Sequence, residues 1–355
     1  MDQNLYDDAV ALLKQLITIE SFSRQEDRTA DAIQAFFSKK KINTHRKLNN
    51  VWVFNKHYNS QLPTILLNSH HDTVKPNTGY TNNPFEPKEE SGKLYGLGSN
   101  DAGGCLVSLI VTFINFYENE NLKYNLVFAA TAEEEISGTN GLELIIPELG
   151  PLDFAIVGEP TQMHLAIAEK GLLVLDCIAY GRSGHAARNE GENAIYNALK
   201  DIEWFKTFQF PKQSELFGSV KMTVTVIKAG SQHNVIPNRC DYTVDVRVTD
   251  AYKNEEIVEV IQKHVSSEVT PRSVRLKPSS IDKNHPIVRA GVALGRSTYG
   301  SPTTSDQALL NIPSLKIGPG DSARSHTANE FIYLNEIKEG IDIYTQLLQK
   351  IITTH

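Results

Sequence analysis

The chain contains 355 residues, and its 35 basic and 42 acidic side chains give a formal net charge of −7 at pH 7. Because no long basic run interrupts this acidic balance, we expect no nucleic-acid partner and no attachment to a membrane. The length favours two domains. Three widely spaced cysteines, an acidic start and only short apolar runs favour a cytoplasmic protein with reduced thiols.

The first part of the chain alternates helical and strand-like patterns. Apolar residues at helical spacing predict helices over 6–18 and up to about residue 39, and Ser23-Arg24-Gln25-Glu26 before the second helix has the form of a capping box. Further helices are predicted at 102–116 and 140–146, and strands at 51–54, 64–67, 125–130 and 154–157. Such alternation predicts an α/β fold whose mostly parallel sheet carries helices on both faces.

The pattern changes near residue 165. Strands of partly alternating polarity are predicted at 172–180, 220–227 and 240–248, with helices at 193–205 and 254–264. We therefore predict an inserted α+β domain, serving as a lid or for dimerisation, over residues 165–274. The catalytic domain would combine residues 1–164 with 275–355, which end in a long amphipathic helix at 334–352.

Side chains of the kinds that bind metals stand at or near the ends of the predicted strands. They are His70, Asp72, Asp101, Glu133-Glu134-Glu135 and Glu159, with His326 far downstream. In open α/β sheets, ligands collect at the carboxyl ends of strands, so two imidazoles and several carboxylates gathered there could hold two zinc-like ions. Because His326 would have to join the others, the first and last stretches must belong to one domain.

Each position also has a less specific interpretation. Most acidic residues are solvated surface groups, His70 and Asp72 could be surface groups beside a helix cap, and the Gly-rich turn at 96–104 could bind phosphate. Asp101 at that turn suits a cation better than an anion. Three consecutive glutamates behind a buried strand could form a polar loop, but they repel one another unless a cation or a shared proton offsets their charge. Alternation along the strand turns His71 away and leaves Asp72 placed to orient or polarise His70.

Taken in order, these motifs resemble the co-catalytic zinc amidohydrolase and peptidase family of acetylornithine deacetylase, succinyl-diaminopimelate desuccinylase, aminoacylase and glutamate carboxypeptidase. The resemblance is strongest to the acetylornithine deacetylase type, and it spans nearly the whole chain. It rests on His70-x-Asp72, Asp101 in its Gly-rich turn, Glu134-Glu135, Gly158-Glu159-Pro160-Thr161 and His326.

The resemblance implies two divalent ions, zinc first, with cobalt or manganese as alternatives. Asp101 would bridge the two ions. One ion would add His70 and Glu159, the other would add Glu135 and His326, and Glu134 would act as the general base. Asp72 would support catalysis behind His70.

The same resemblance extends to the inserted domain. Gly181-Arg182-Ser183-Gly184-His185-Ala186-Ala187 resembles the segment whose histidine stabilises the oxyanion across a homodimer interface. Asn234 and Arg247 resemble substrate-binding positions, with Arg247 suited to a bidentate grip on a carboxylate. Ser305-Asp306 and Gly318–Gly320 resemble segments that shape the acyl pocket. Without the resemblance, His185 is equally a surface histidine and Arg247 equally a charge on the exterior of a strand.

Two positions depart from the family pattern. Relatives commonly have lysine two residues after the bridging aspartate, where this chain has Gly103, and aspartate before the glutamate pair, where it has Glu133. Neither change removes a ligand, but the first puts the subfamily in doubt.

The resemblance implies metal-dependent hydrolysis of the amide bond of a small N-acyl amino acid by a homodimer. We expect N-acetyl- or N-succinyl-ornithine or -citrulline of arginine biosynthesis as substrate. A succinyl-diaminopimelate desuccinylase is the alternative, followed by a dipeptidase or carboxypeptidase. A metal-poor amino-acid-binding homologue is the non-enzyme alternative. A single-zinc helix protease is disfavoured because the sequence contains no His-Glu-x-x-His.

Overall fold

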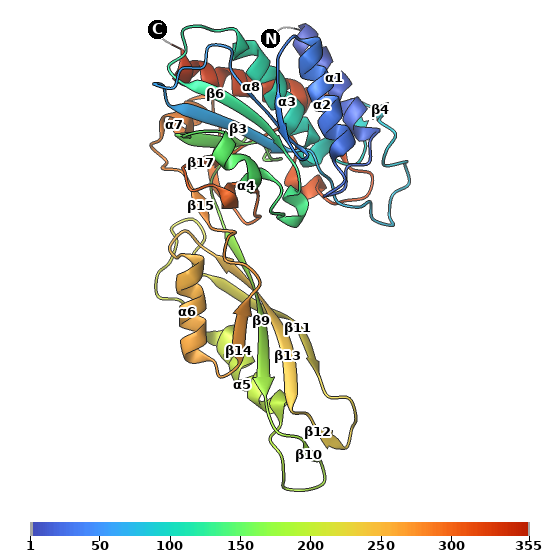
Figure 1. Ribbon diagram of the computed structural model, residues 1–355, viewed down its shortest axis with the longest axis vertical. Helices are drawn as coiled ribbons and strands as arrows, with labels where there is room; N and C mark the ends of the chain where they lie inside the picture. Colours follow the sequence, from blue (N-terminus) through green and yellow to red (C-terminus); the bar gives the residue numbers. More distant parts are fainter. Residues whose placement is uncertain (1–2, 354–355) are drawn as a thin grey trace. The chain divides into compact units, whose positions relative to one another are not determined.

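The computed structural model describes residues 3–353, and their contacts divide the chain into two units (Figure 1). The first unit runs up to Ile167, includes Ser280–Tyr299 and resumes at Ser305, whereas the second comprises Ala168–Ser279 and Gly300–Thr304. The observed second unit thus begins and ends slightly later than the expected 165–274, and it gains a short return segment. Within the described residues, no helix combines the length and apolar character that a membrane span requires.

The first unit is built on a nine-stranded mixed sheet. Its strands are β1 His45–Lys47, β2 Asn50–Phe54, β3 Thr64–His70, β6 Asn125–Thr131, β7 Phe154–Val157, β8 Leu165–Glu169, β15 Ser279–Ser280, β16 Thr298–Ser301 and β17 Ser314–Lys316. They lie in the order β1-β2-β6-β3-β7-β17-β8-β15, and β16 pairs with β8. The central pairs β6–β3, β3–β7 and β7–β17 are parallel, as continuous apolar runs in buried strands predict.

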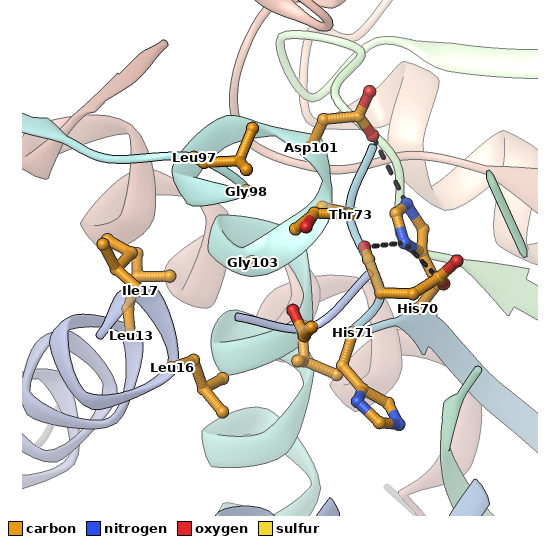
Figure 2. Close-up of a pocket in the computed structure, with 14 residues that line it drawn as sticks. Leu13, Leu16, Ile17, His70, His71, Thr73, Leu97, Gly98, Asp101 and Gly103 are labelled. Atoms are coloured by element: carbon orange, nitrogen blue, oxygen red, sulfur yellow. Dashed lines mark hydrogen bonds and ion pairs between the residues drawn. The ribbon is translucent and has the colours of Figure 1, made fainter. Parts of the chain in front are cut away.

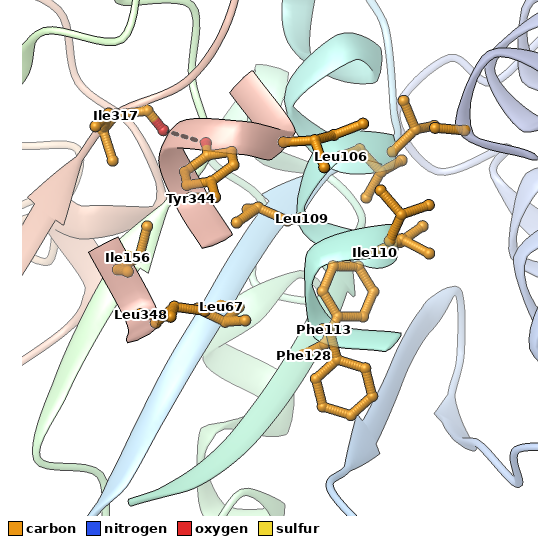
Figure 3. Packing of buried hydrophobic residues seen from close by; sticks show 14 of the residues in the cluster. Leu67, Leu106, Leu109, Ile110, Phe113, Phe128, Ile156, Ile317, Tyr344 and Leu348 are labelled. Carbon is orange, nitrogen blue, oxygen red and sulfur yellow. Dashed lines mark hydrogen bonds between the residues drawn. The ribbon is translucent and has the colours of Figure 1, made fainter. Parts of the chain in front are cut away.

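Helices pack on both faces of this sheet, which confirms the predicted α/β fold. They are α1 Gln3–Ile17, α2 Asp27–Lys39, α3 Gly104–Tyr117, α4 Leu142–Ile145, α7 Pro286–Ala293 and α8 Leu334–Ile352. Alternate residues of β3 divide between two cores. Ile65 and Leu67 join the large core with α1, α2, α3, α7 and α8 (Figure 3), and Leu66 joins a smaller core with α4. In the large core the Tyr344 hydroxyl donates to the carbonyl of Ile317 at 2.5 Å.

Short elements connect these helices and strands. They are β4 Lys88–Glu90, β5 Lys93–Tyr95 and β18 Phe331–Tyr333, which form a small sheet, the π-turn η1 Ser99–Gly103, and the 3-10 turns η2 Glu134–Ile136, η3 Ile146–Glu148, η4 Asp306–Leu309 and η5 Ser322–Arg324. Two predicted helices are therefore shorter than expected. The helix expected from residue 102 begins at Gly104 because η1 precedes it, and the helix expected at 140–146 shrinks to α4, with η3 and its Pro147 directly after it.

The predicted capping box before α2 is wrong. The helix begins at Asp27, and Glu26 occupies the N-cap position without a side-chain cap hydrogen bond. The Ser23 hydroxyl instead donates to Asp72 Oδ2 at 2.6 Å, on a different element of the fold. Both side chains of the pattern are therefore used for contacts beyond the helix.

The second unit contains a four-stranded antiparallel sheet in the order β11-β13-β9-β14 and a separate pair, β10–β12. Its elements are β9 Gly171–Tyr180, β10 Gly184–His185, α5 Ala194–Thr207, β11 Lys221–Ala229, β12 Val235–Ile236, β13 Arg239–Val248, α6 Asn254–His264 and β14 Glu268–Pro271. Along β9, buried Leu173, Leu175 and Cys177 alternate with half-buried residues. The buried set forms a core of its own with residues of α5 and α6, as a one-faced sheet predicts.

Candidate metal centre

The ligand-type residues come from loops at one edge of the parallel sheet. His70 is the last residue of β3, Glu159 follows β7, and Glu134 and Glu135 lie in η2 after β6. Because β6, β3 and β7 are parallel neighbours, their carboxyl ends meet at the same edge. Asp101 arrives from η1, where the Asp101–Ala102 peptide is cis.

His70, Asp101 and Glu159 form the first group of donors, whose ligand atoms all lie within 4.8 Å of one another. His70 Nε2 lies 3.3 Å from Asp101 Oδ1 and 3.7 Å from Glu159 Oε1. The other ring nitrogen, Nδ1, lies 3.0 Å from the carbonyl oxygen of Asp72. This second contact directs Nε2 towards the two carboxylates, as expected of a metal-binding histidine.

Asp101, Glu135 and His326 form the second group. His326 Nε2 lies 2.9 Å from Glu135 Oε2 and 3.5 Å from Asp101 Oδ2. The two oxygens of Asp101 therefore face different imidazoles, Oδ1 towards His70 and Oδ2 towards His326. The structure brings His326 to the other ligand-type residues although it lies far from them in the sequence.

The electrostatics of this cluster favour cations. Burial raises the pKa of Glu134 well above its usual value and that of Glu159 to about 8, and nearby carboxylates add to both shifts. A hydrogen bond to Glu135 raises the pKa of His326 to about 9. So many carboxylates resist ionising together unless positive charge offsets them. The donors are imidazole nitrogens and carboxylate oxygens, which zinc accepts, so the residues fit two divalent ions.

Asp72 lies behind His70 and is almost completely buried. Its carboxylate accepts the Ser23 hydroxyl at 2.6 Å and the backbone N–H groups of Glu134 at 3.1 Å and Glu135 at 3.2 Å. Asp72 thus contacts both the histidine end of β3 and the turn that carries the two glutamates.

His71 points away from the ligand cluster, as strand alternation predicts (Figure 2). Its Nδ1 lies 2.9 Å from the Thr29 hydroxyl and its Nε2 lies 2.9 Å from the carbonyl oxygen of Asn49. Burial lowers the pKa of His71 to about 4, so the ring is neutral at pH 7. His71 therefore links the end of β3 to the start of α2, and its ring does not face the donor groups.

An apolar pocket lies beside His70 and Asp101, and α1 contributes Leu13, Leu16 and Ile17 to its wall (Figure 2). Gly103 faces the same helix. A Cβ atom at position 103 would lie 2.4 Å from the carbonyl oxygen of Gly98 and 2.6 Å from Leu13 Cδ1. The turn therefore has no room for the lysine that relatives commonly carry at this position.

Glu330 supports the turn that carries Asp101. It is 2% exposed and accepts the backbone N–H groups of Gly98 at 3.1 Å, Asn100 at 2.8 Å and Asp101 at 2.9 Å. Sequence reasoning did not assign this role. The available signal was the position of Glu330, four residues after His326 on one segment.

The three residues predicted in the second unit do not all lie together. His185 pairs with Val235 across β10–β12, and the N–H of Ala186 donates to the carbonyl of Asn234 at 3.0 Å. Arg247 lies near the far end of β13, where its Nε donates to Asp245 Oδ1 at 2.9 Å. The β10–β12 pair lies beyond the first residue of β13, Arg239, and the eight residue steps from Arg239 to Arg247 span about 26 Å. One small carboxylate therefore cannot contact Asn234 and Arg247 of the same chain.

Comparisons with known proteins match this chain over most of its length. Residues 66–350 match the description of peptidase family M20/M25/M40. A LysW-lysine/LysW-ornithine hydrolase of Sulfurisphaera tokodaii is 29% identical over 96% of this chain and 94% of its own. A succinyl-diaminopimelate desuccinylase of Wolbachia pipientis is 24% identical over 96% of this chain and 93% of its own. The crystal structure of aminopeptidase PepT from Bacillus cereus has a TM-score of 0.77 at 17% identity and covers 98% of each chain.

Proposed function

This chain belongs to peptidase family M20/M25/M40 and hydrolyses amide bonds, and we propose that its substrate is a small N-acylated amino acid. We propose N-acetyl- or N-succinyl-ornithine or -citrulline as the first substrates. The observation that carries the proposal is the sharing of Asp101 between two donor groups, with Glu134 directly beside them.

In the proposed site, His70 and Glu159 would hold one ion and Glu135 and His326 would hold the other, with Asp101 available to both donor groups. Two divalent ions, zinc first and cobalt or manganese as alternatives, would lower the pKa of a bound water towards about 7 and polarise the substrate carbonyl.

Glu134 is the proposed general base. Its Oε2 lies 3.9 Å from His70 Nε2, which places the carboxylate at the edge of the first donor group. Burial raises the pKa of Glu134, which suits a group that takes a proton from the attacking water and returns it to the leaving nitrogen. Asp72 supports these steps by orienting His70 and the backbone of Glu134.

The second unit would supply substrate contacts. Arg247 is the proposed partner of the substrate carboxylate, and His185 and Asn234 are proposed to stabilise the oxyanion and hold the substrate. Since about 26 Å of β13 separates Arg247 from the β10–β12 pair, we propose a homodimer in which His185 and Asn234 serve the site of the second copy.

Two of the relatives support particular choices for the amine and for the acyl group of the substrate. The Sulfurisphaera protein is named for hydrolysis of LysW-lysine and LysW-ornithine, which supports ornithine as the amine half here. Its alignment over 96% of this chain also supports a second candidate, hydrolysis of LysW-lysine or LysW-ornithine. The Wolbachia desuccinylase supports a succinyl group as the acyl half.

A substrate panel tests the proposal. Metal-loaded enzyme would be offered N-acetyl and N-succinyl derivatives of ornithine, citrulline and diaminopimelate, together with unacylated dipeptides. We expect kcat/KM for an acylated ornithine or citrulline to exceed that of the dipeptides by at least about a hundredfold, or about 3 kcal/mol of transition-state discrimination. Equal turnover of unacylated dipeptides would refute the assignment.

A further inference from the structure

The turn that carries Glu134 and Glu135 donates backbone hydrogen bonds to two buried carboxylates from other segments of the chain. The N–H of Glu133 donates to Glu26 Oε1 at 3.3 Å, and the next two N–H groups donate to the two oxygens of Asp72 at 3.1 and 3.2 Å. Three successive backbone donors thus end on carboxylates from two other segments of the chain. Hydrogen bonds to charged acceptors are generally stronger than neutral ones, so these three contacts add to the turn's own hydrogen bonds.

The turn closes on two backbone hydrogen bonds of its own, from the N–H of Ser137 to the carbonyl of Glu134 and from the N–H of Gly138 to the carbonyl of Glu133, but other features work against it. Glu133 has a φ of 56° and Ser137 a φ of 48°, and a left-handed backbone costs a non-glycine residue roughly 1–2 kcal/mol. None of the three residues of η2 is buried, so apolar packing does not fix it. Glu133, Glu134 and Glu135 are also consecutive, and their charges repel one another.

The segment before α2 provides this support through Ser23 and Glu26. The Ser23 hydroxyl donates to Asp72 Oδ2 at 2.6 Å, which fixes the oxygen that also accepts the N–H of Glu135. Glu26 is completely buried; its Oε1 also accepts the N–H of Arg24, and its second oxygen accepts Asn49 Nδ2 at 2.8 Å. Because Glu26 makes no side-chain cap bond to α2, its carboxylate remains available to Asn49 and to the turn.

We propose that Ser23 and Glu26 are positioning residues for amide hydrolysis, acting through the backbone of residues 133–135 to aim Glu134 at the attacking water. Both residues precede residue 66, where the family match begins. The inference rests on the proposed role of Glu134. Misplacing a catalytic group by about 1 Å can cost about a hundredfold in rate, so a modest movement of this turn is sufficient to matter.

The test uses Glu26→Gln, Glu26→Ala and Ser23→Ala in the full chain. Glutamine keeps the size of glutamate and an oxygen for the N–H groups of Arg24 and Glu133, and its NH₂ group would face the Asn49 amide, so it is the conservative variant. Glu20→Gln and Ser38→Ala are matched controls, because both side chains are exposed in the same N-terminal region. If Glu26→Ala fails to fold, Ser23→Ala carries the same test through Asp72.

The first measurement is amide hydrogen exchange of the metal-free protein. We expect the N–H groups of residues 133–135 to exchange at least about tenfold faster in Glu26→Ala and Ser23→Ala and by a smaller factor in Glu26→Gln, with β6 and both controls unchanged. Unchanged exchange at 133–135 would overturn the proposal. Equal acceleration throughout β6 would also overturn it, since that outcome describes general destabilisation. This measurement requires no substrate, so it stands even if the proposed reaction is wrong.

The second measurement separates kcat from KM on the best substrate of the panel. In Glu26→Ala and Ser23→Ala we expect kcat to fall at least about tenfold with KM within about threefold, because the substrate contacts are untouched. In a Glu134→Gln background, the same substitutions should change kcat by less than about twofold, since the group they position is absent. A rise in KM alone, or an undiminished further loss of kcat in that background, would overturn the positioning role.

Discussion

Glu330 offers a quantitative test of how the turn around Asp101 is held. Its carboxylate is the acceptor for three backbone N–H groups, from Gly98, Asn100 and Asp101. Leaving one buried donor unsatisfied costs about 1–3 kcal/mol, so Glu330→Ala would cost about 3–9 kcal/mol. That loss approaches the whole stability of an ordinary protein, about 5–15 kcal/mol. Glu330→Ala would therefore unfold the first unit, and an unfolded variant gives little information about the site.

Glu330→Gln is the informative change. The N–H groups of Asn100 and Asp101 both donate to Oε1, which a glutamine oxygen can replace, whereas Gly98 donates to Oε2, where glutamine would place an NH₂ group. One donor is lost, so we expect the free energy of unfolding to fall by about 1–3 kcal/mol. We also expect weaker binding at both proposed zinc positions, because Asp101 belongs to both donor groups.

The two tryptophans allow a clean assay, since Trp52 lies in the first unit and Trp204 in the second. In a Trp204→Phe background, urea unfolding followed by fluorescence reports the first unit alone, and competition with a chelator gives the zinc affinity. Glu259→Gln, in the second unit with a side chain 69% exposed, is the matched control. Unfolding and zinc affinity identical to those of the background protein would refute this account of Glu330.

Three further predictions follow from the site. Glu134→Ala should retain both metals by elemental analysis yet lose at least about a hundredfold in kcat, the scale of a general base, and turnover within about tenfold of wild type would exclude that role. Gly103→Lys should lower the free energy of unfolding by about 1–3 kcal/mol or more, because its Cβ would meet Gly98 and Leu13; an unchanged urea midpoint would contradict the steric argument. His71 has a folded pKa of about 4, below its unfolded value, so the unfolded chain binds more protons between these values and stability falls as pH drops through 6.5 towards 4. Between pH 7 and pH 5, His71 accounts for about 2 kcal/mol of the lost free energy of unfolding. His71→Asn should therefore lose about 2 kcal/mol less than wild type when urea unfolding is measured at the two pH values. An equal loss in the two proteins would contradict a neutral His71.

The elements that sequence predicts well are those with a strong local pattern. The last helix, α8, spans the predicted residues 334–352, and β7 spans the predicted 154–157. The ligand-type residues were also identifiable, because parallel strands bring their carboxyl ends to one edge wherever each strand lies in the sequence. The length of helix α4 was overestimated, because apolar spacing at 140–146 does not reveal that η3 follows directly after Ile145.

The misassigned capping box shows where local reasoning fails. Serine followed three residues later by glutamate suits a helix start, where a cap contributes about 1 kcal/mol. In this fold the same two side chains have stronger competitors, the buried Asp72 carboxylate and the N–H of Glu133, which lie 49 and 107 residues away. A helix start exposed to water can satisfy its N–H groups with solvent, whereas a donor buried beside a cluster of carboxylates cannot. The contact that avoids the larger desolvation cost is the one that forms. A sequence pattern confined to about a dozen residues does not include the distant partners that set this cost.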